Sequence, residues 1–280
     1  AELTRTGIGL PAYYNDEVII PALQNRGLSL EDARDYNIIG CVEPQKAGKT
    51  EGWHDAAFFN MCRPLELVFA NGMDKGEIVG IPTGDVTQMK SFEEFFDAYK
   101  KQMEYCISLL VNADNAIDVA HAERCPLPFL SCMIDDCLKE GRSVQEGGAV
   151  YNFTGPQGFG IANMADGLFP IRKLVYEEKK VSMEEFKEAL AWNYDKGLDA
   201  QSAGDMTEMI MKAMQKAGKE ADASTAAGLL KTFIGMKPGE QKTQRFKEIH
   251  DMIDEVPKFG NDIPEIDYFA REVAYTYSKP

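Results

Sequence analysis

The sequence has little positive charge and no long hydrophobic run. Its 280 residues contain 30 Lys and Arg against 45 Asp and Glu, which gives a formal net charge of −15. Nucleic-acid phosphates and anionic membrane surfaces are bound by clustered Lys and Arg, so we expect neither as a partner. No run approaches the roughly 18 apolar residues that cross a bilayer. With 44% hydrophobic and 27% charged residues, the composition is that of a globular chain without a membrane span.

Histidine is scarce, and the cysteines lack the spacing of a zinc site. Six cysteines occur without any Cys-x-x-Cys pair, and there are three histidines. His121 and Cys125 stand four residues apart, but the other histidines, His54 and His250, belong to no second ligand pair. Structural zinc is normally held by paired Cys and His ligands. We therefore expect reduced cysteines, no metal and a cytoplasmic location.

Motifs for nucleotide binding and hydrolysis are also missing. The glycine-rich stretch 147–163 contains Gly158-Phe-Gly160 but lacks the third glycine of a dinucleotide fingerprint. Gly48-Lys-Thr50 has no upstream glycine at the spacing of a P-loop, and no Gly-x-Ser-x-Gly elbow occurs. We expect the 147–163 stretch to be a tight loop that packs near a ligand or another backbone.

Three capping motifs predict where helices begin. Ser29–Asp32, Ser91–Glu94 and Ser182–Glu185 each place a serine three residues before an acidic residue, so that the two side chains can satisfy backbone N–H groups reciprocally. The first motif predicts a helix over 30–36. Behind the second, apolar side chains that we expect to form core fall on one helical face: Phe92, Phe95, Phe96, Tyr99, Met103, Cys106, Ile107 and Leu110.

Strand signals are few and short. An apolar run at 38–42 and the β-prone run 149–153 are separated by long helical stretches. Short strands between long helices predict an α/β architecture. The methionine- and lysine-rich segment at about 201–255 predicts a helical excursion attached to the main body.

The segment 39–60 carries the most informative chemistry. It sets the thiol of Cys41 two residues before the carboxylate of Glu43, and in an extended segment these side chains share a face. Cys41 follows an apolar run and a glycine, so we expect it at the tip of a buried strand. A neighbouring carboxylate disfavours the thiolate, which suits a thiol that donates a hydrogen atom beside a base better than a nucleophile. From the residues alone, a structural turn and an active site are equally good interpretations.

Longer stretches resemble a known family. Gly40–Pro44 (Gly-Cys-Val-Glu-Pro) is similar to the thiyl-cysteine loop of glycyl radical enzymes, the pyruvate formate-lyase-like family. The match continues through 48–55 and resembles the dehydratase branch that acts on glycerol and propane-1,2-diol. Further resemblance in 121–129, 151–157 and 257–262 extends it over nearly the whole chain.

The resemblance implies a fold and a domain organisation. Such enzymes have a ten-stranded α/β barrel with the cysteine loop inside it. Residues 1–280 would be the central part of that barrel, with surrounding helices and the excursion at about 201–255. The family's Arg-Val-Ala/Ser-Gly-Tyr radical motif does not occur in the sequence. We therefore expect the N-terminal half of the barrel and the glycyl radical domain to lie outside this chain.

The resemblance also implies roles for four residues. Cys41 would become a thiyl radical and take a hydrogen atom from C1 of a diol, and Glu43 would remove the C1 hydroxyl proton. Asp55 would hydrogen-bond the substrate hydroxyls, and His54 would support Asp55 more than touch the substrate. The family's acid for the leaving hydroxyl is a histidine upstream of the cysteine loop. No histidine precedes His54 here, so that role is unfilled.

Cofactor and partner expectations follow from the same resemblance. No cofactor would be bound, because the glycyl radical is installed by an S-adenosylmethionine [4Fe-4S] activating enzyme. The partners would be a small diol substrate, that activating enzyme and a second copy of the whole enzyme in a homodimer. The location would be cytoplasmic, with a bacterial microcompartment left open. Alternatives are C–N cleavage of choline, C–S cleavage of isethionate, hydroxyproline dehydration, or a non-catalytic fragment.

Overall fold

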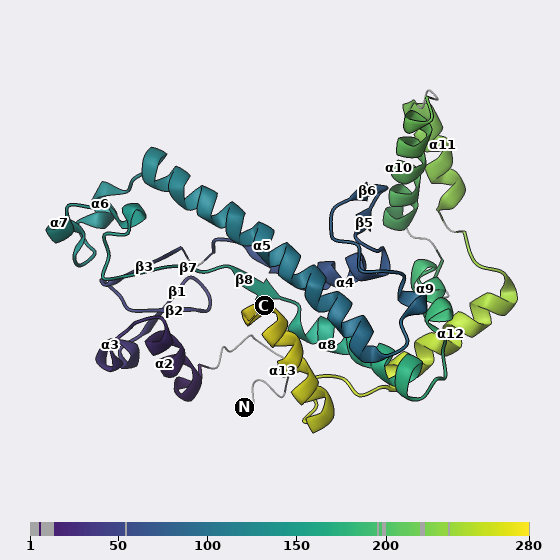
Figure 1. The fold of residues 1–280 in the computed structure, drawn as a ribbon, viewed down its shortest axis with the longest axis horizontal. Coiled ribbons are helices and arrows are strands. Elements are labelled where there is room, and N and C mark those ends of the chain that lie inside the picture. Colours follow the sequence, from purple (N-terminus) through teal and green to yellow (C-terminus); the bar gives the residue numbers. More distant parts are fainter. Residues whose placement is uncertain are drawn as a thin grey trace. The chain divides into compact units, whose positions relative to one another are not determined.

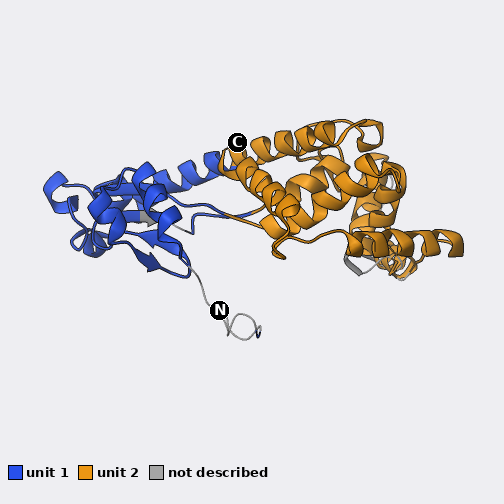
Figure 2. Ribbon diagram, turned by 90° about the horizontal axis from the view of Figure 1, so that it is seen from below, with its two compact units in different colours: residues 1–59, 110–157 blue, residues 60–109, 158–280 orange. Residues whose placement is uncertain are grey.

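The computed structural model describes residues 6, 14–53, 55–194, 196–197, 200–218, 222–234 and 236–279 (Figure 1). The chain forms two compact units, shown in different colours in Figure 2. Unit 1 contains residues 1–59 and 110–157, and unit 2 contains residues 60–109 and 158–280. Each unit is described by itself below.

Unit 1 combines short strands with short helices. Its helices are α2 (Asp16–Asn25), α3 (Leu30–Arg34), α6 (Pro128–Ser131), α7 (Cys137–Glu140) and the 3₁₀ turn η2 (Val144–Glu146). Its strands are β1 (Asn37–Ile39), β2 (Glu43–Gln45), β3 (Thr50–Trp53) and β7 (Tyr151–Thr154). β1 pairs with β2 as an antiparallel hairpin, and β3 pairs with β7 in parallel from Thr50↔Tyr151 to Trp53↔Thr154.

A polar contact ties α3 to the parallel pair of unit 1. The carboxylate of Asp32 accepts hydrogen bonds from Tyr151 Oη at 2.7 Å and from Lys49 Nζ at 2.8 Å. Lys49 immediately precedes β3, and Tyr151 opens β7. Under this contact, Leu23, Leu28 and Ala33 form a small buried cluster. Segments more than 100 residues apart in sequence are thereby joined in unit 1.

Unit 2 is mostly helical. Its helices are α4 (Cys62–Phe69), η1 (Val86–Gln88), α8 (Ile161–Pro170), the π-helical η3 (Ile171–Glu177), α9 (Met183–Ala191), α10 (Ala200–Lys216), α11 (Ala223–Phe233), α12 (Glu240–Glu255) and α13 (Pro264–Ser278). Its hairpin is β5 (Met73–Asp74) with β6 (Glu77–Ile78). Three elements contain boundaries between the units: β4 (Phe58–Asn60), β8 (Gln157–Phe159) and the long helix α5 (Phe92–Arg124).

Aromatic packing dominates the core of unit 2. The ring of Phe269 on α13 lies 5.7 Å from those of Phe92 and Phe96 and 5.9 Å from that of Phe169. Tyr99 and Met103, one and two turns along α5, are fully buried. The stripe on this helix is therefore core, as the sequence predicts, as far as Met103. Beyond that point Cys106, Ile107 and Leu110 are half-buried.

The predicted helix starts are confirmed, with differences in detail. Ser182 makes both reciprocal bonds of a capping box at α9. Ser91 Oγ accepts the N–H of Glu94 at 3.2 Å, but the Glu94 carboxylate accepts the N–H of Lys90 instead of closing the box on Ser91. The helix expected over 30–36 ends at Arg34, where Asp35 leaves the helical conformation. The β-prone run at 149–153 becomes β7, which starts at Tyr151.

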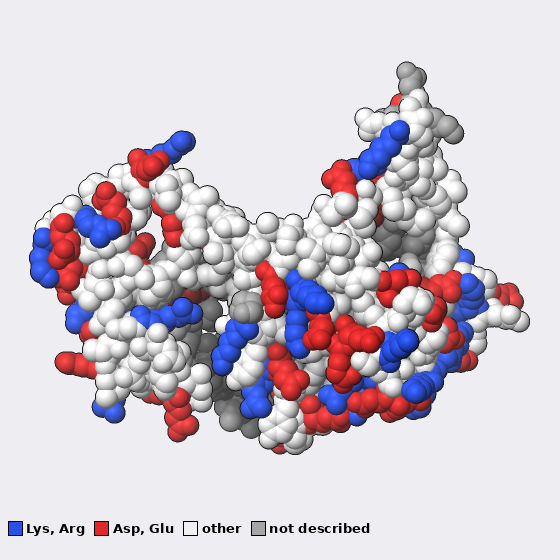
Figure 3. Space-filling model, viewed as in Figure 1, with Lys and Arg blue, Asp and Glu red and all other residues white. Residues whose placement is uncertain are grey.

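The strands of the described residues form pairs and do not close a barrel. Short strands among long helices agree with the predicted α/β character. The 201–255 stretch contains α10, α11 and α12. In the part of the chain that the structure describes, no helix is long and apolar enough to cross a membrane. On the face seen in Figure 3, basic side chains are interspersed with acidic ones.

Glycines in the 147–163 stretch allow close packing. A Cβ at Gly148 would lie 2.3 Å from the carbonyl oxygen of Arg142, and one at Gly158 would lie 2.7 Å from the ring of Tyr277. Gly160 adopts a φ of +97°, with Cys62 Sγ 3.2 Å from where a Cβ would be. The stretch is not one tight loop, because it contains β7, β8 and the start of α8. Its glycines nevertheless approach other protein segments closely, as expected.

Candidate active site

Cys41 lies at the tip of the β1–β2 hairpin. The register pairs Ile39 with Glu43, so residues 40–42 form the connecting loop. Gly40 opens it with a φ of +61°, a conformation that glycine adopts without strain. The carbonyl of Cys41 accepts a hydrogen bond from Tyr14 Oη at 2.9 Å, and its thiol is free and exposed.

The expectation of a buried, extended segment is wrong. Ile39 is 44% exposed and Val42 is 51% exposed, so β1 is a half-exposed hairpin strand. Cys41 lies in a turn, where alternation of side chains between two faces does not apply. The Glu43 carboxylate lies close to the loop that carries Cys41 for a different reason. The Glu43 side chain folds back over the loop that precedes it.

Glu43 is buried and bound by its own hairpin loop. Its Oε2 accepts the backbone N–H groups of Cys41 and Val42, each at 2.9 Å. The N–H of Val42, helped by that of Cys41, holds the pKa of the Glu43 carboxyl below its usual range, although burial opposes this. Hydrogen bonds to the charged form favour ionisation. The carboxylate is therefore deprotonated at neutral pH, as a base must be.

Gly40 provides the space for this arrangement. A Cβ at position 40 would lie 2.8 Å from Glu43 Oε2. Glycine suits this position for two reasons: it adopts the positive φ without strain, and a Cβ would crowd the Glu43 carboxylate.

Asp55 joins the site through Gln157, a residue to which the sequence assigns no role. Gln157 Nε2 donates to Glu43 Oε1 at 2.7 Å and also to Asp55 Oδ1. The structure therefore brings together Cys41, Glu43 and Asp55, the three predicted site residues that it describes. The fourth, His54, lies outside the described residues. Gln157 stands in the 151–157 stretch that carries part of the family resemblance, which is the one signal that could have pointed to it.

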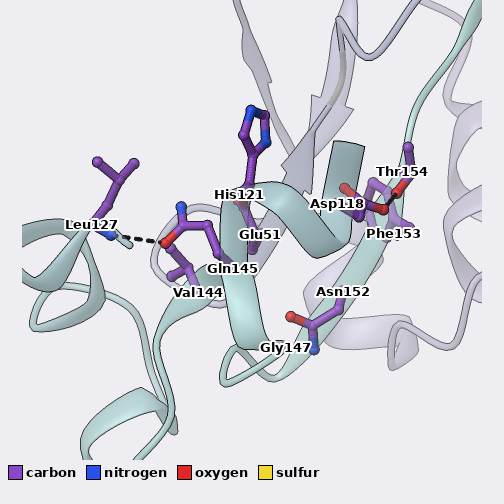
Figure 4. A pocket seen from close by; sticks show the side chains of 10 residues that line it. All are labelled: Glu51, Asp118, His121, Leu127, Val144, Gln145, Gly147, Asn152, Phe153 and Thr154. Carbon is purple, nitrogen blue, oxygen red and sulfur yellow. Dashed lines mark hydrogen bonds between the residues drawn. The ribbon is translucent and has the colours of Figure 1, made fainter. Parts of the chain in front are cut away.

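A separate cavity of about 390 Å³ lies within unit 1 (Figure 4). Its lining includes Glu51, Asp118 and His121 and none of the residues of the cysteine loop. Thr154 Oγ1 donates to Asp118 at 2.7 Å. Burial, and then the charge of Asp118, raises the pKa of Glu51. Among the described residues, no three His, Cys, Asp or Glu side chains lie close enough together to hold a metal ion.

The chain belongs to the pyruvate formate lyase-like family, whose model matches residues 1–280. This match, together with the relatives that follow, confirms the resemblance to glycyl radical dehydratases. One relative is (2S)-3-sulfopropanediol dehydratase of Klebsiella oxytoca, which is 40% identical over 195 residues, or 69% of this chain and 24% of that protein.

Two solved structures are similar over almost the whole chain. One, described for 1,2-propanediol dehydration in Roseburia inulinivorans, has 62% identity and a TM-score of 0.92 and covers 100% of this chain and 33% of its own. The other is the glycerol-bound B12-independent glycerol dehydratase of Clostridium butyricum, with 48% identity and a TM-score of 0.75. The match covers 99% of this chain and 29% of that protein. The chain thus spans a quarter to a third of these relatives. They are glycyl radical enzymes, whose fold is a barrel.

Proposed function

We propose that this chain carries the thiyl cysteine and the base of a glycyl radical diol dehydratase, which converts glycerol or propane-1,2-diol to the aldehyde and water. The observation that carries the proposal is the cysteine hairpin: a thiol-bearing loop whose backbone binds the Glu43 carboxylate, with the Asp55 carboxylate beside it. Two carboxylate acceptors suit a neutral substrate with two hydroxyl donors. The relatives described for propanediol and glycerol support this substrate class.

The proposed steps balance without a further oxidant or reductant. The Cys41 sulfur radical takes a hydrogen atom from C1, which leaves a thiol and a carbon radical bearing a hydroxyl. Glu43 accepts the proton of that hydroxyl, which is far more acidic in the radical than in the alcohol. The C–O bond at C2 breaks, and the departing hydroxyl becomes water with a proton that balances the one taken up by Glu43, so that Glu43 returns to the carboxylate form. The resulting aldehyde radical takes a hydrogen atom from the Cys41 thiol, which restores the sulfur radical.

The radical would come from a glycine outside this chain, installed by an S-adenosylmethionine [4Fe-4S] activating enzyme. It would supply the unpaired electron that Cys41 needs. The remaining roles belong to residues of this chain: Cys41 transfers the hydrogen atom, Glu43 holds the proton, and Asp55 orients the hydroxyls. A homodimer of the whole enzyme belongs to the same proposal.

The decisive variant is Cys41→Ala in the full-length protein, activated anaerobically. We expect the glycyl radical signal in electron paramagnetic resonance to persist while aldehyde formation falls to background, because the hydrogen carrier is missing. Cys132→Ala is the matched control, since Cys132 is also a free, exposed cysteine of unit 1. Aldehyde formation by Cys41→Ala at the rate of the control would disprove the assignment.

A substrate panel tests the reaction itself. The wild-type protein is assayed with glycerol, propane-1,2-diol, trans-4-hydroxyproline, isethionate and choline. Turnover of a diol alone is the expected result. Turnover of one of the other three substrates and not of a diol would place the protein among the other lyases of its family, which include an isethionate sulfite-lyase and a hydroxyproline dehydratase.

A further inference from the structure

Gln157 lies between the two carboxylates of the site. Its Nε2 carries two hydrogens, and the structure directs them to two different acids, Glu43 and Asp55. These acids are 114 and 102 residues away in sequence. A single amide group therefore connects the hairpin loop to the loop that follows β3.

The backbone of Gln157 is fixed to the same loop. Its N–H donates to the carbonyl of Ala57 at 2.8 Å, two residues beyond Asp55. The side chain and the main chain of Gln157 thus both contact the loop that follows β3. Gln157 itself is half-buried, so its amide is partly shielded from water, which strengthens its hydrogen bonds.

The neutral amide of Gln157 donates a hydrogen bond to each of two neighbouring carboxylates. Two carboxylates that share a site repel each other, and one of them usually takes up a proton. The Nε2 group of Gln157 is a donor shared by the two carboxylates, and its hydrogen bond helps to lower the pKa of Glu43. The Glu43 carboxylate already accepts two backbone N–H groups on Oε2, and Gln157 occupies a third position on Oε1. A carboxylate has about four acceptor positions, so Glu43 keeps about one for a substrate hydroxyl.

We propose that Gln157 is a positioning residue, whose amide sets the distance between the Glu43 and Asp55 carboxylates so that they receive the two adjacent hydroxyls of the substrate. This rests on the proposed function and adds a residue to it. Gln157 does not touch the reacting atoms. It acts through the two acids, so its loss should change KM for the diol and the pH dependence of kcat/KM.

The test replaces Gln157 by methionine in the activated full-length protein. Methionine has nearly the same length but no N–H donor, so both carboxylates lose the bridge. We expect KM for propane-1,2-diol to rise and kcat/KM to fall by about tenfold or more. The acid limb of the kcat/KM profile should move to higher pH, because the hydrogen bond from Gln157 is one of the contacts that lower the pKa of Glu43.

Gln145→Met is the matched control. Gln145 is also a half-buried glutamine of unit 1, and its Oε1 accepts one hydrogen bond, from the N–H of Leu127 at 2.9 Å. This variant should keep the wild-type KM and the wild-type acid limb. A Gln157→Met protein that merely loses kcat to the same extent at every pH, with KM unchanged, would have lost a structural contact only and would overturn the inference.

A second variant and the activity of the wild type separate the remaining outcomes. If Gln157→Met does not fold, Gln157→Asn replaces it, because asparagine keeps the NH₂ group on a side chain one methylene shorter. An acid limb and KM equal to those of the wild type would then reject a positioning role. A wild-type protein that turns over no diol would reject the proposed function itself. An active wild-type protein whose KM and acid limb do not change on substitution of Gln157 would reject only this inference.

Discussion

At the scale of single residues, the candidate site depends on a carboxylate that folds back onto its own loop. The sequence predicts that the side chains of Cys41 and Glu43 share a face through alternation along a strand, whereas in the structure the Glu43 carboxylate binds the backbone N–H groups of Cys41 and Val42. Gly40 turns the chain and leaves room, and two backbone N–H groups bind the carboxylate. Residue spacing cannot predict this, because it depends on a side-chain rotamer and a positive φ.

The first prediction concerns Gly40. Gly40→Ala should displace the Glu43 carboxylate, since the new Cβ would lie 2.8 Å from Oε2. Gly48→Ala is the control: Gly48 also has a positive φ, +75°, but nothing lies within 4 Å of its Cβ position. Both variants should lose about 1 kcal/mol of unfolding free energy from backbone strain.

Only the Gly40 variant should also lose diol dehydration beyond what its stability explains. The measurement combines urea unfolding with the activity of the activated full-length protein. Equal activity of the two variants would show that the position of the Glu43 carboxylate does not depend on Gly40.

The second prediction is a pH dependence. The pKa of Glu43 is lowered in the folded protein, chiefly by the N–H of Val42. Its contribution to stability is therefore fully present above the pKa of an unfolded glutamic acid, about 4.3, and is lost as the pH falls through the folded value. The difference in unfolding free energy between wild type and Glu43→Gln should shrink on going from pH 7 to below pH 4.

Glu123→Gln provides the control for that measurement. Glu123 is an exposed acid near the end of α5 in unit 1. Urea titrations at both pH values should give a nearly constant difference for this variant. The same constant difference for Glu43→Gln would mean that the hairpin loop does not stabilise the charged carboxylate.

At the scale of elements, helices were predictable and strand partners were not. Local signals fix where α9 begins, because a serine and a glutamate three residues apart bind each other's backbone. No local signal pairs β3 with β7, which lie about 100 residues apart, or links Tyr151 to Asp32. These contacts depend on the tertiary fold, which the periodicity of apolar residues along the sequence does not predict.

The third prediction tests a local signal. Ser182→Ala removes one bond of the capping box at α9 and should lower the unfolding free energy by about 1 kcal/mol. Ser224→Ala changes an exposed serine inside α11, where alanine is a better helix former, and should be neutral or slightly stabilising. Equal urea midpoints for the two variants would contradict the capping role of Ser182.

At the scale of the whole molecule, the site is assembled from three separate segments. The cysteine hairpin supplies Cys41 and Glu43, the loop after β3 supplies Asp55, and the start of β8 supplies Gln157. The amide of Gln157 joins the two acids. The family resemblance identified two of these segments by their chemistry and the third only as part of a matching stretch. The closed barrel and the glycyl radical domain stay predictions.

The central claim is that Cys41 carries one hydrogen atom away from C1 and returns it to C2. The most direct test is dehydration of propane-1,2-diol deuterated at both C1 positions by the activated full-length protein in ordinary water. The propanal is reduced at once to propanol, so that the aldehyde cannot exchange hydrogen at C2. The account predicts deuterium at C2 of the product. Product whose C2 has gained only hydrogen from the solvent would contradict it.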